Sequence, residues 1–176
     1  LDRSIEGEDT GFDDDYTASG DKRSLFLPAT QQKLAQAVCD VCENVIVVLL
    51  CGSSIDVGEK VRKHAKAVIH AWYPGSLGGL ALAEILSGEV NPSAKLPVTI
   101  YDGNHSLPAF EDYNMKGRTY RYIDGDALYP FGFGLSYTTY DVKCVSAALE
   151  KNTVKAEVLV KNTGSFRGKE VVQLYL

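Results

Sequence analysis

The sequence predicts an α/β protein, with a mainly parallel sheet flanked by helices and a truncated all-β segment after it. Two observations carry this prediction. Up to about residue 101, apolar β-branched runs alternate with helical patterns, the order typical of right-handed βαβ units. After about residue 136, three β-like runs follow one another without a helix between them. We therefore expect two domains, at residues 1–136 and 137–176.

The elements of the first domain follow in chain order. Residues 1–24 are polar, acidic and punctuated by glycine, which predicts a loop. Pro28 suits the first turn of a helix, and Leu34, Ala37, Val38 and Val41 would share one face of it. The continuous apolar run 45–51 predicts a strand buried on both faces. We then expect a short polar helix at 56–64, a strand at 67–72, a helix at 80–86 that ends at Gly88, and a strand at 96–101.

The rest of the chain follows a different pattern. Residues 102–136 are rich in aromatic residues, glycine and proline, and a loop of this length is usually functional or packs over another part. Strands are expected at 137–149, 154–161 and 170–176, and the alternation in 154–161 predicts one buried face. Three strands cannot close a seven-stranded sandwich, and the first residue is not methionine. We therefore expect a fragment of a longer protein.

Charge excludes two classes of partner. The 176 residues have a net charge of −5, so there is no positive field to attract nucleic acid or an anionic membrane. The imbalance is local, because residues 1–15 hold seven acidic residues and one arginine. The longest strongly apolar run, 45–51, is far shorter than the ~20 residues that span a bilayer.

The cysteines predict no metal site. Cys39 and Cys42 form one C-x-x-C within a helical pattern, whereas a structural zinc site needs a second Cys or His pair. We expect Cys39, Cys42, Cys51 and Cys144 to be small apolar residues, buried or half-buried. Four unpatterned cysteines favour a reducing compartment such as the cytoplasm, with secretion left open.

Two further patterns fall short of a catalytic or cofactor motif. The glycine turn at 75–79 is not G-x-G-x-x-G, and no Gly-Lys-Ser/Thr follows it, so no nucleotide cofactor is predicted. Ser53 follows a strand without a G-x-S-x-G elbow. His64, His70 and His105 have no evident catalytic partner, and His70 is expected to be a core or edge residue.

The acidic loop leaves two interpretations open. It holds Glu6 and Glu8 in Ile5-Glu6-Gly7-Glu8-Asp9, and it continues through Asp13-Asp14-Asp15. One interpretation is a solvated acidic loop or a weak cation site, although the spacing of a calcium loop is absent. The other is that one glutamate donates a proton. Clustered carboxylates raise the pKa of one of their members, as a general acid requires.

Several motifs resemble glycoside hydrolase family 3. They are Ser4-Ile5-Glu6-Gly7-Glu8, Gly20-Asp21-Lys22-Arg23 with Leu27-Pro28, Ala71-Trp72-Tyr73-Pro74-Gly75, Asn91-Pro92-Ser93-Ala94-Lys95-Leu96-Pro97, Lys116-Gly117-Arg118-Thr119-Tyr120-Arg121-Tyr122 and Leu128-Tyr129-Pro130-Phe131-Gly132. They occur in family order and are similar to the C-terminal α/β-sandwich domain of β-glucosidase and β-xylosidase members. The tail from about Thr138 is similar to the start of a fibronectin type III-like domain.

The resemblance implies a retaining exo-β-glycosidase that acts on a β-linked oligosaccharide or glycoside. In this family the nucleophile is an Asp on a preceding barrel domain, and the acid/base is a Glu on a loop of the present domain. The matching residue is Glu8, with Glu6 as the alternative because an insert follows in this sequence. The 176 residues contain no barrel, so the barrel domain of the parent chain is the expected partner and the fragment alone is expected to be inactive.

Other functions stay open at this point. The domain could be a non-catalytic carbohydrate-binding or packing domain of the same architecture, and a nucleotide-binding α/β protein is a third, disfavoured possibility. The aromatic stretch 113–133 could line a sugar subsite or form a structural bridge.

Overall fold

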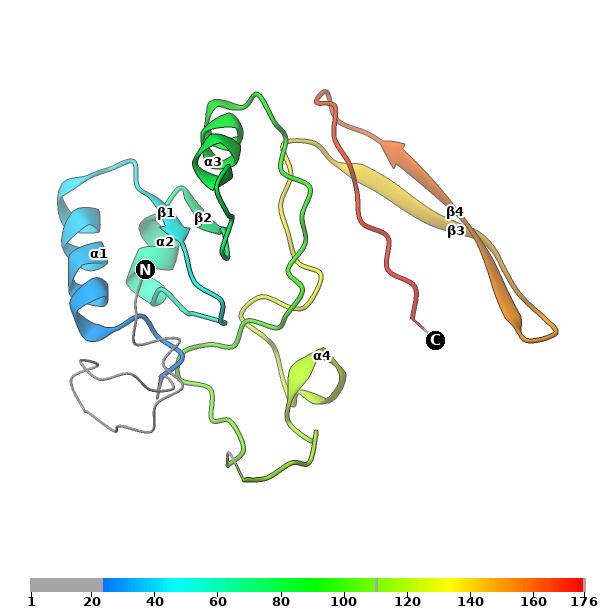
Figure 1. The fold of residues 1–176 in the computed structure, drawn as a ribbon, viewed down its shortest axis with the longest axis horizontal. Helices are drawn as coiled ribbons and strands as arrows, with labels where there is room; N and C mark the ends of the chain where they lie inside the picture. Colours follow the sequence, from blue (N-terminus) through cyan, green and yellow to red (C-terminus); the bar gives the residue numbers. More distant parts are fainter. Residues whose placement is uncertain (1–23, 110, 176) are drawn as a thin grey trace. The chain divides into compact units, whose positions relative to one another are not determined.

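The computed structural model describes residues 24–109 and 111–175. Figure 1 labels the helices and strands along the chain. By their contacts, the residues divide into two compact units. One unit comprises the chain up to Gly79 together with Val98–Phe131, and the other comprises Leu80–Pro97 together with Gly132–Leu176. This division concerns contacts, so the domain boundary between residues 136 and 137 stays a prediction.

The first unit has a small α/β core. Its elements are α1 (Ala29–Val41), β1 (Ile46–Leu49), α2 (Glu59–His64), β2 (Ala67–His70) and α4 (Thr119–Tyr122). β1 pairs with β2 in parallel, from Ile46 opposite Ala67 to Leu49 opposite His70. Ala35 and Cys39 of α1 and Val61 of α2 pack with the apolar residues in and around β1. The α/β class and the parallel pairing are therefore confirmed, in a sheet of two short strands.

Helix α1 begins where the sequence predicted, directly after Pro28, but a different face is buried. Cys39 is buried, whereas Leu34 is 66% exposed and Val41 is 83% exposed. The prediction that 45–51 is buried on both faces is wrong as well. Val45, Leu49 and Cys51 are buried, but Ile46 is 50% exposed. Successive side chains of a strand alternate, and within the described residues only one face of β1 is covered.

The third predicted strand, 96–101, does not form. In the first unit, Ile100 of this segment instead forms an isolated antiparallel bridge with Tyr129. In the second unit Leu96 exchanges hydrogen bonds with Phe133 and Gly132. These residues therefore pair with the aromatic stretch that follows them, and Pro97 removes one backbone donor from the run.

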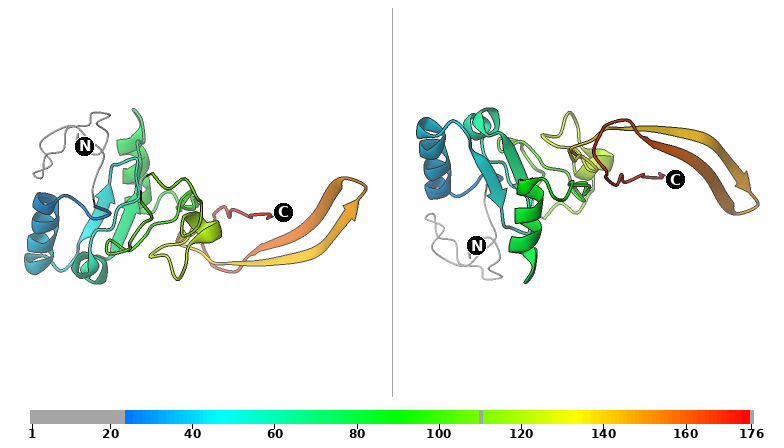
Figure 2. Two further views of the ribbon diagram at one scale, coloured as in Figure 1. Left: turned by 90° about the horizontal axis from the view of Figure 1, so that it is seen from below. Right: turned by 90° about the horizontal axis from the view of Figure 1, so that it is seen from above.

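The second unit contains an antiparallel hairpin, β3 (Tyr140–Glu150) and β4 (Thr153–Asn162), with a bulge between Cys144 and Ser146. Figure 2 shows the hairpin as a long, twisted pair of strands. The predicted buried face of 154–161 is not observed, because nearly every residue of both strands is exposed. Residues 170–175 form no strand, so the third predicted β run is also wrong.

One asparagine and one lysine organise the second unit near the hairpin. Asn91 Oδ1 accepts hydrogen bonds from Ser136 Oγ at 2.9 Å and the Tyr137 backbone at 2.8 Å, while its Nδ2 donates to the Arg167 carbonyl at 3.2 Å. Lys95 Nζ donates to the Gly134 carbonyl at 2.8 Å and lies 3.2 Å from Glu170. The unit also contains most of α3 (Gly78–Ser87), which follows the glycine turn. Within the described residues, no helix has the length and apolar character needed to cross a membrane.

Candidate functional site

Both candidate acid residues, Glu8 and Glu6, lie outside the described residues. Their role therefore stays a prediction. The described chain begins at Ser24, directly after the acidic stretch that holds them. The beginning of the described chain is held by residues around Asp56.

The chain at Leu25–Leu27 pairs with Asp56 as a short parallel bridge. The Asp56 backbone N–H donates to the Leu25 carbonyl at 2.8 Å, and the Leu27 backbone N–H donates to the Asp56 carbonyl at 3.3 Å. Directly after this bridge, Leu27 enters the apolar core and α1 begins at Ala29. The bridge is therefore the first fixed point of the described chain.

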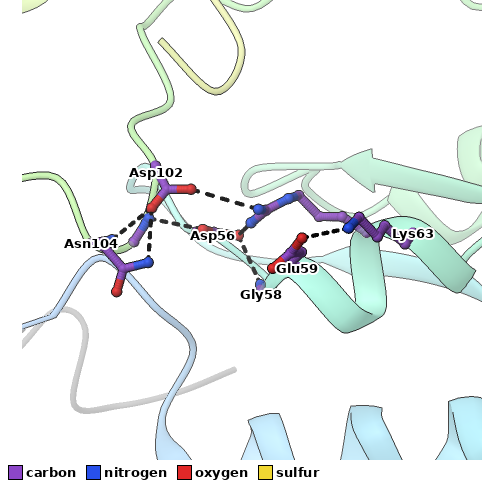
Figure 3. A network of polar contacts seen from close by, with 8 residues as sticks. Asp56, Gly58, Glu59, Lys63, Asp102 and Asn104 are labelled. Carbon is purple, nitrogen blue, oxygen red and sulfur yellow. Dashed lines mark hydrogen bonds and ion pairs between the residues drawn. The ribbon is translucent and has the colours of Figure 1, made fainter. Parts of the chain in front are cut away.

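The Asp56 side chain is fully buried and has a partner on each oxygen (Figure 3). Oδ1 accepts from the Gly58 backbone at 2.7 Å and from the Arg62 guanidinium, and Oδ2 accepts from the Gly103 backbone at 2.8 Å. A buried carboxylate is tolerated when it is paired and hydrogen-bonded in this way. Asp56 thus ties together residues 25–27, the start of α2 and the loop that begins at Asp102.

The sequence placed Asp56 inside a polar helix, and the structure corrects this. Helix α2 begins at Glu59, with Gly58 as its N-cap at φ +86°, a conformation that favours glycine. The side chain of Asp56 accepts from the backbone two residues ahead, an Asx-type turn that competes with helix formation. The D-x-G spacing was the one signal in the sequence for this arrangement.

Asp102 extends the polar network toward solvent. Its carboxylate accepts from the Asn104 backbone at 2.9 Å and the Asn104 side chain at 3.1 Å, and it lies 3.6 Å from Arg62. These hydrogen bonds, together with Arg62, hold the pKa of Asp102 below its ordinary value. On the exposed side of α2, Lys63 donates to Glu59 and lowers the pKa of that carboxyl in the same way.

Asp112 repeats the turn chemistry of Asp102. It accepts from the Asn114 backbone at 2.9 Å and the Asn114 amide at 2.8 Å, and these two bonds lower its pKa from the ordinary value of 3.8. We expect the Asp102 and Asp112 carboxyls to titrate below pH 3.8. Their stabilisation is therefore complete above that pH and is lost as the pH falls through the lower folded-state pKa.

An NMR titration of the side-chain carboxyl resonances measures the pKa values of Asp102 and Asp112. Asn114→Ala should raise the pKa of Asp112 toward 3.8, because it removes the side-chain donor. The same variant should leave Asp102 unchanged, because Asp102 uses Asn104. A pKa of Asp112 that is insensitive to this substitution would contradict the assigned cause.

A second polar group lies where β1 and β2 end. His70 Nε2 lies 3.1 Å from the Ser53 carbonyl and 3.7 Å from Cys51 Sγ, and its ring packs against Trp72 at 4.0 Å. Trp72 has φ +53°, a strained value for a bulky residue. His70 is half-buried at the edge of the sheet, as predicted.

The cysteines match expectation in part. Cys39 and Cys51 are buried, whereas Cys42 and Cys144 are exposed, and none of the four forms a disulfide with another described residue. Among the residues that the structure describes, no three His, Cys, Asp or Glu side chains come together in a way that could hold a metal ion.

One arginine organises the loop after Asp102. Arg118 Nη2 donates to the carbonyls of Ala109 at 2.9 Å and Asp112 at 2.8 Å, and the Thr119 backbone donates to Tyr101 Oη at 2.6 Å. Farther along, Tyr120 stacks on Phe131 with ring centroids 4.5 Å apart. The predicted aromatic stretch is thus partly packed within its own unit, although Tyr113 is 88% exposed.

Comparison with known proteins defines the class of this α/β domain. The family model described as "Glycosyl hydrolase family 3 C-terminal domain" matches residues 2–137. The chain therefore belongs to the C-terminal domain family of the family 3 glycosyl hydrolases, as the sequence motifs indicated.

Individual relatives agree with this assignment. The chain is 43% identical over 175 residues to a xylan 1,4-beta-xylosidase of Xylanibacter ruminicola, covering 98% of this chain and 20% of that protein. It is 36% identical over 180 residues to the beta-glucosidase BoGH3A of Bacteroides ovatus, covering 89% and 24%. The chain thus spans about a fifth to a quarter of the length of these relatives.

The fold of this chain is also similar to that of solved structures. DesR, a beta-glucosidase from Streptomyces venezuelae in complex with D-glucose, matches with a TM-score of 0.72 and 34% identity, covering 83% of this chain and 21% of that one. Beta-glucosidase 3B from Thermotoga neapolitana, in complex with glycerol, matches with a TM-score of 0.69 and 28% identity, covering 80% and 22%.

Proposed function

We propose that this chain is the C-terminal domain of a retaining exo-β-glycosidase and that it supplies the acid/base glutamate, Glu8. The substrate is a β-linked glycoside of the glucoside or xyloside class. The nucleophile is an Asp on a barrel domain elsewhere in the parent chain, and that barrel is the partner of this domain.

The family match over residues 2–137, a range that includes Glu6 and Glu8, carries the proposal. Relatives named as a beta-xylosidase and a beta-glucosidase support the substrate class, and their greater length supports a parent with further domains. The residues themselves support the acid role, because clustered carboxylates raise the pKa of one member. Glu8 shares its segment with Glu6 and five aspartates within the first 15 residues.

The chemistry requires two carboxyl groups about 5–5.5 Å apart. The nucleophile attacks the anomeric carbon while Glu8 protonates the leaving oxygen, which gives a glycosyl-enzyme intermediate. Glu8 then removes a proton from the water that hydrolyses this intermediate. The proton given in the first step is thereby recovered in the second.

The decisive experiment compares leaving groups in the intact parent enzyme. Glu8→Gln should lower kcat/KM about 10²–10⁴-fold for glycosides with poor leaving groups. The loss should be far smaller for activated aryl glycosides, because their leaving group departs without a proton. Glu6→Gln is measured in parallel, and Glu59→Gln, which removes the charge of an exposed carboxyl outside this segment, is the matched control.

The outcomes separate the candidates. A dependence on the leaving group in Glu8→Gln alone supports the assignment, and the same signature in Glu6→Gln alone transfers the acid role to Glu6. Equal losses on both kinds of substrate in both variants would contradict an acid in this segment. That result would favour a non-catalytic carbohydrate-binding or packing domain.

A further inference from the structure

We infer that Asp56 is a positioning residue for the glycosidase reaction, because it holds residues 25–27, which lie just after the acid-bearing segment in the sequence. This inference rests on the proposed function, since it presumes that the acid lies within residues 1–23. Asp56 itself is outside that segment and is too deeply buried to contact a substrate.

The first step of the argument is the number of bonds that converge on Asp56. Its backbone holds Leu25 and Leu27, and its carboxylate holds Gly58, Arg62 and Gly103. One buried residue therefore connects the beginning of the described chain to the start of α2 and to the 102–104 turn.

The second step is steric. The ring of Phe26 fills the space above Gly103, where an added Cβ would lie 2.2 Å from ring atom Cε1. Residues 25–27 are consequently held on one side by the Asp56 backbone and on the other by the turn that the Asp56 carboxylate fixes. Substitution of Gly103 would displace Phe26 and leave the Asp56–Arg62 pair intact.

The third step concerns magnitude. Without the bridge, the next fixed point is Leu27, whose side chain is buried in the apolar core, directly before α1. The backbone position of residues 25–27 matters because a misplacement of about 1 Å in a catalytic group can cost on the order of 10²-fold.

The experiment uses Asp56→Asn and Gly103→Ala in the intact parent enzyme. Asp56→Asn removes the charge that holds Arg62 and weakens the acceptor for Gly103, and Gly103→Ala moves Phe26. Both should lower kcat/KM for a poor leaving group about 10-fold, with less than about a two-fold loss on an activated aryl glycoside. Glu59→Gln is the matched control, because it alters an exposed ion pair on α2 that makes no contact with residues 25–27.

A purely structural role predicts a different pattern. A lower fraction of folded enzyme reduces kcat/KM for both substrates by the same factor, so equal losses in both variants would overturn the inference. If Asp56→Asn does not fold, Gly103→Ala decides the question alone. If Glu8→Gln or Glu6→Gln shows the leaving-group signature and Gly103→Ala does not, the proposed function survives and only the role of Asp56 is wrong.

Discussion

The isolated 176-residue chain should not hydrolyse aryl β-glycosides, with activity at least about 10⁴-fold below that of the parent enzyme. A retaining glycosidase needs two carboxyl groups on opposite sides of the anomeric carbon, and this domain is proposed to supply one of them. Where catalytic groups act as a unit, loss of the nucleophile alone can cost about as much as loss of the whole set. The chain should therefore fail to hydrolyse activated aryl glycosides, which need no protonation, as well as glycosides with poor leaving groups.

The measurement is an aryl β-glucoside and β-xyloside assay on the purified chain. Trp72 is the single tryptophan, so its fluorescence establishes beforehand that the first unit is folded. Addition of the separately produced barrel domain should restore turnover, and Glu8→Gln in the 176-residue chain should prevent this restoration for poor leaving groups. Turnover by the chain alone that Glu8→Gln abolishes would contradict a nucleophile on another domain.

Asp56→Ala should destabilise the first unit by about 3–5 kcal/mol, the cost typical of removing one partner from a buried ion pair. The substitution leaves the Arg62 side chain, which is 17% exposed, without its buried counter-ion. It also leaves the backbone N–H groups of Gly58 and Gly103 without an acceptor.

Urea unfolding followed by Trp72 fluorescence measures this effect in the unit that contains Asp56. Lys63→Ala is the matched control, because its partner Glu59 is 69% exposed and such surface pairs contribute about 0.3–0.5 kcal/mol. A difference of less than about 1 kcal/mol between the two variants would show that Asp56 is not the centre of this unit.

Helices α1 and α3 were the most predictable elements of the fold, whereas α4 lies in the stretch 102–136, where a loop was expected. Pro28 marked the start of α1, and Gly88 marked the end of α3, because proline and glycine act on the backbone locally. The strands were less predictable. Whether 96–101 joins a sheet depends on its partners, and Ile100 pairs with Tyr129, which is far away in the sequence. The same dependence explains why β4 alternates in sequence yet has no buried face within the described chain.

The network around Asp56 could not be predicted, for a physical reason. An aspartate before a polar helix is usually solvated, and only tertiary contact with Leu25 and Gly103 buries this one. The candidate acid residues, in contrast, were found from the sequence alone. Glu8 and Glu6 were found through a motif, and they lie outside the described residues.

The sequence by itself determined the family, the α/β class and the segment in which the proton donor is expected. These properties are carried by local motifs and by charge, which do not depend on how the chain packs. Only the tertiary structure decided that Asp56 joins three separate segments at the point where the acidic stretch ends. Burial of a charge and the convergence of its partners arise when distant parts of the chain meet.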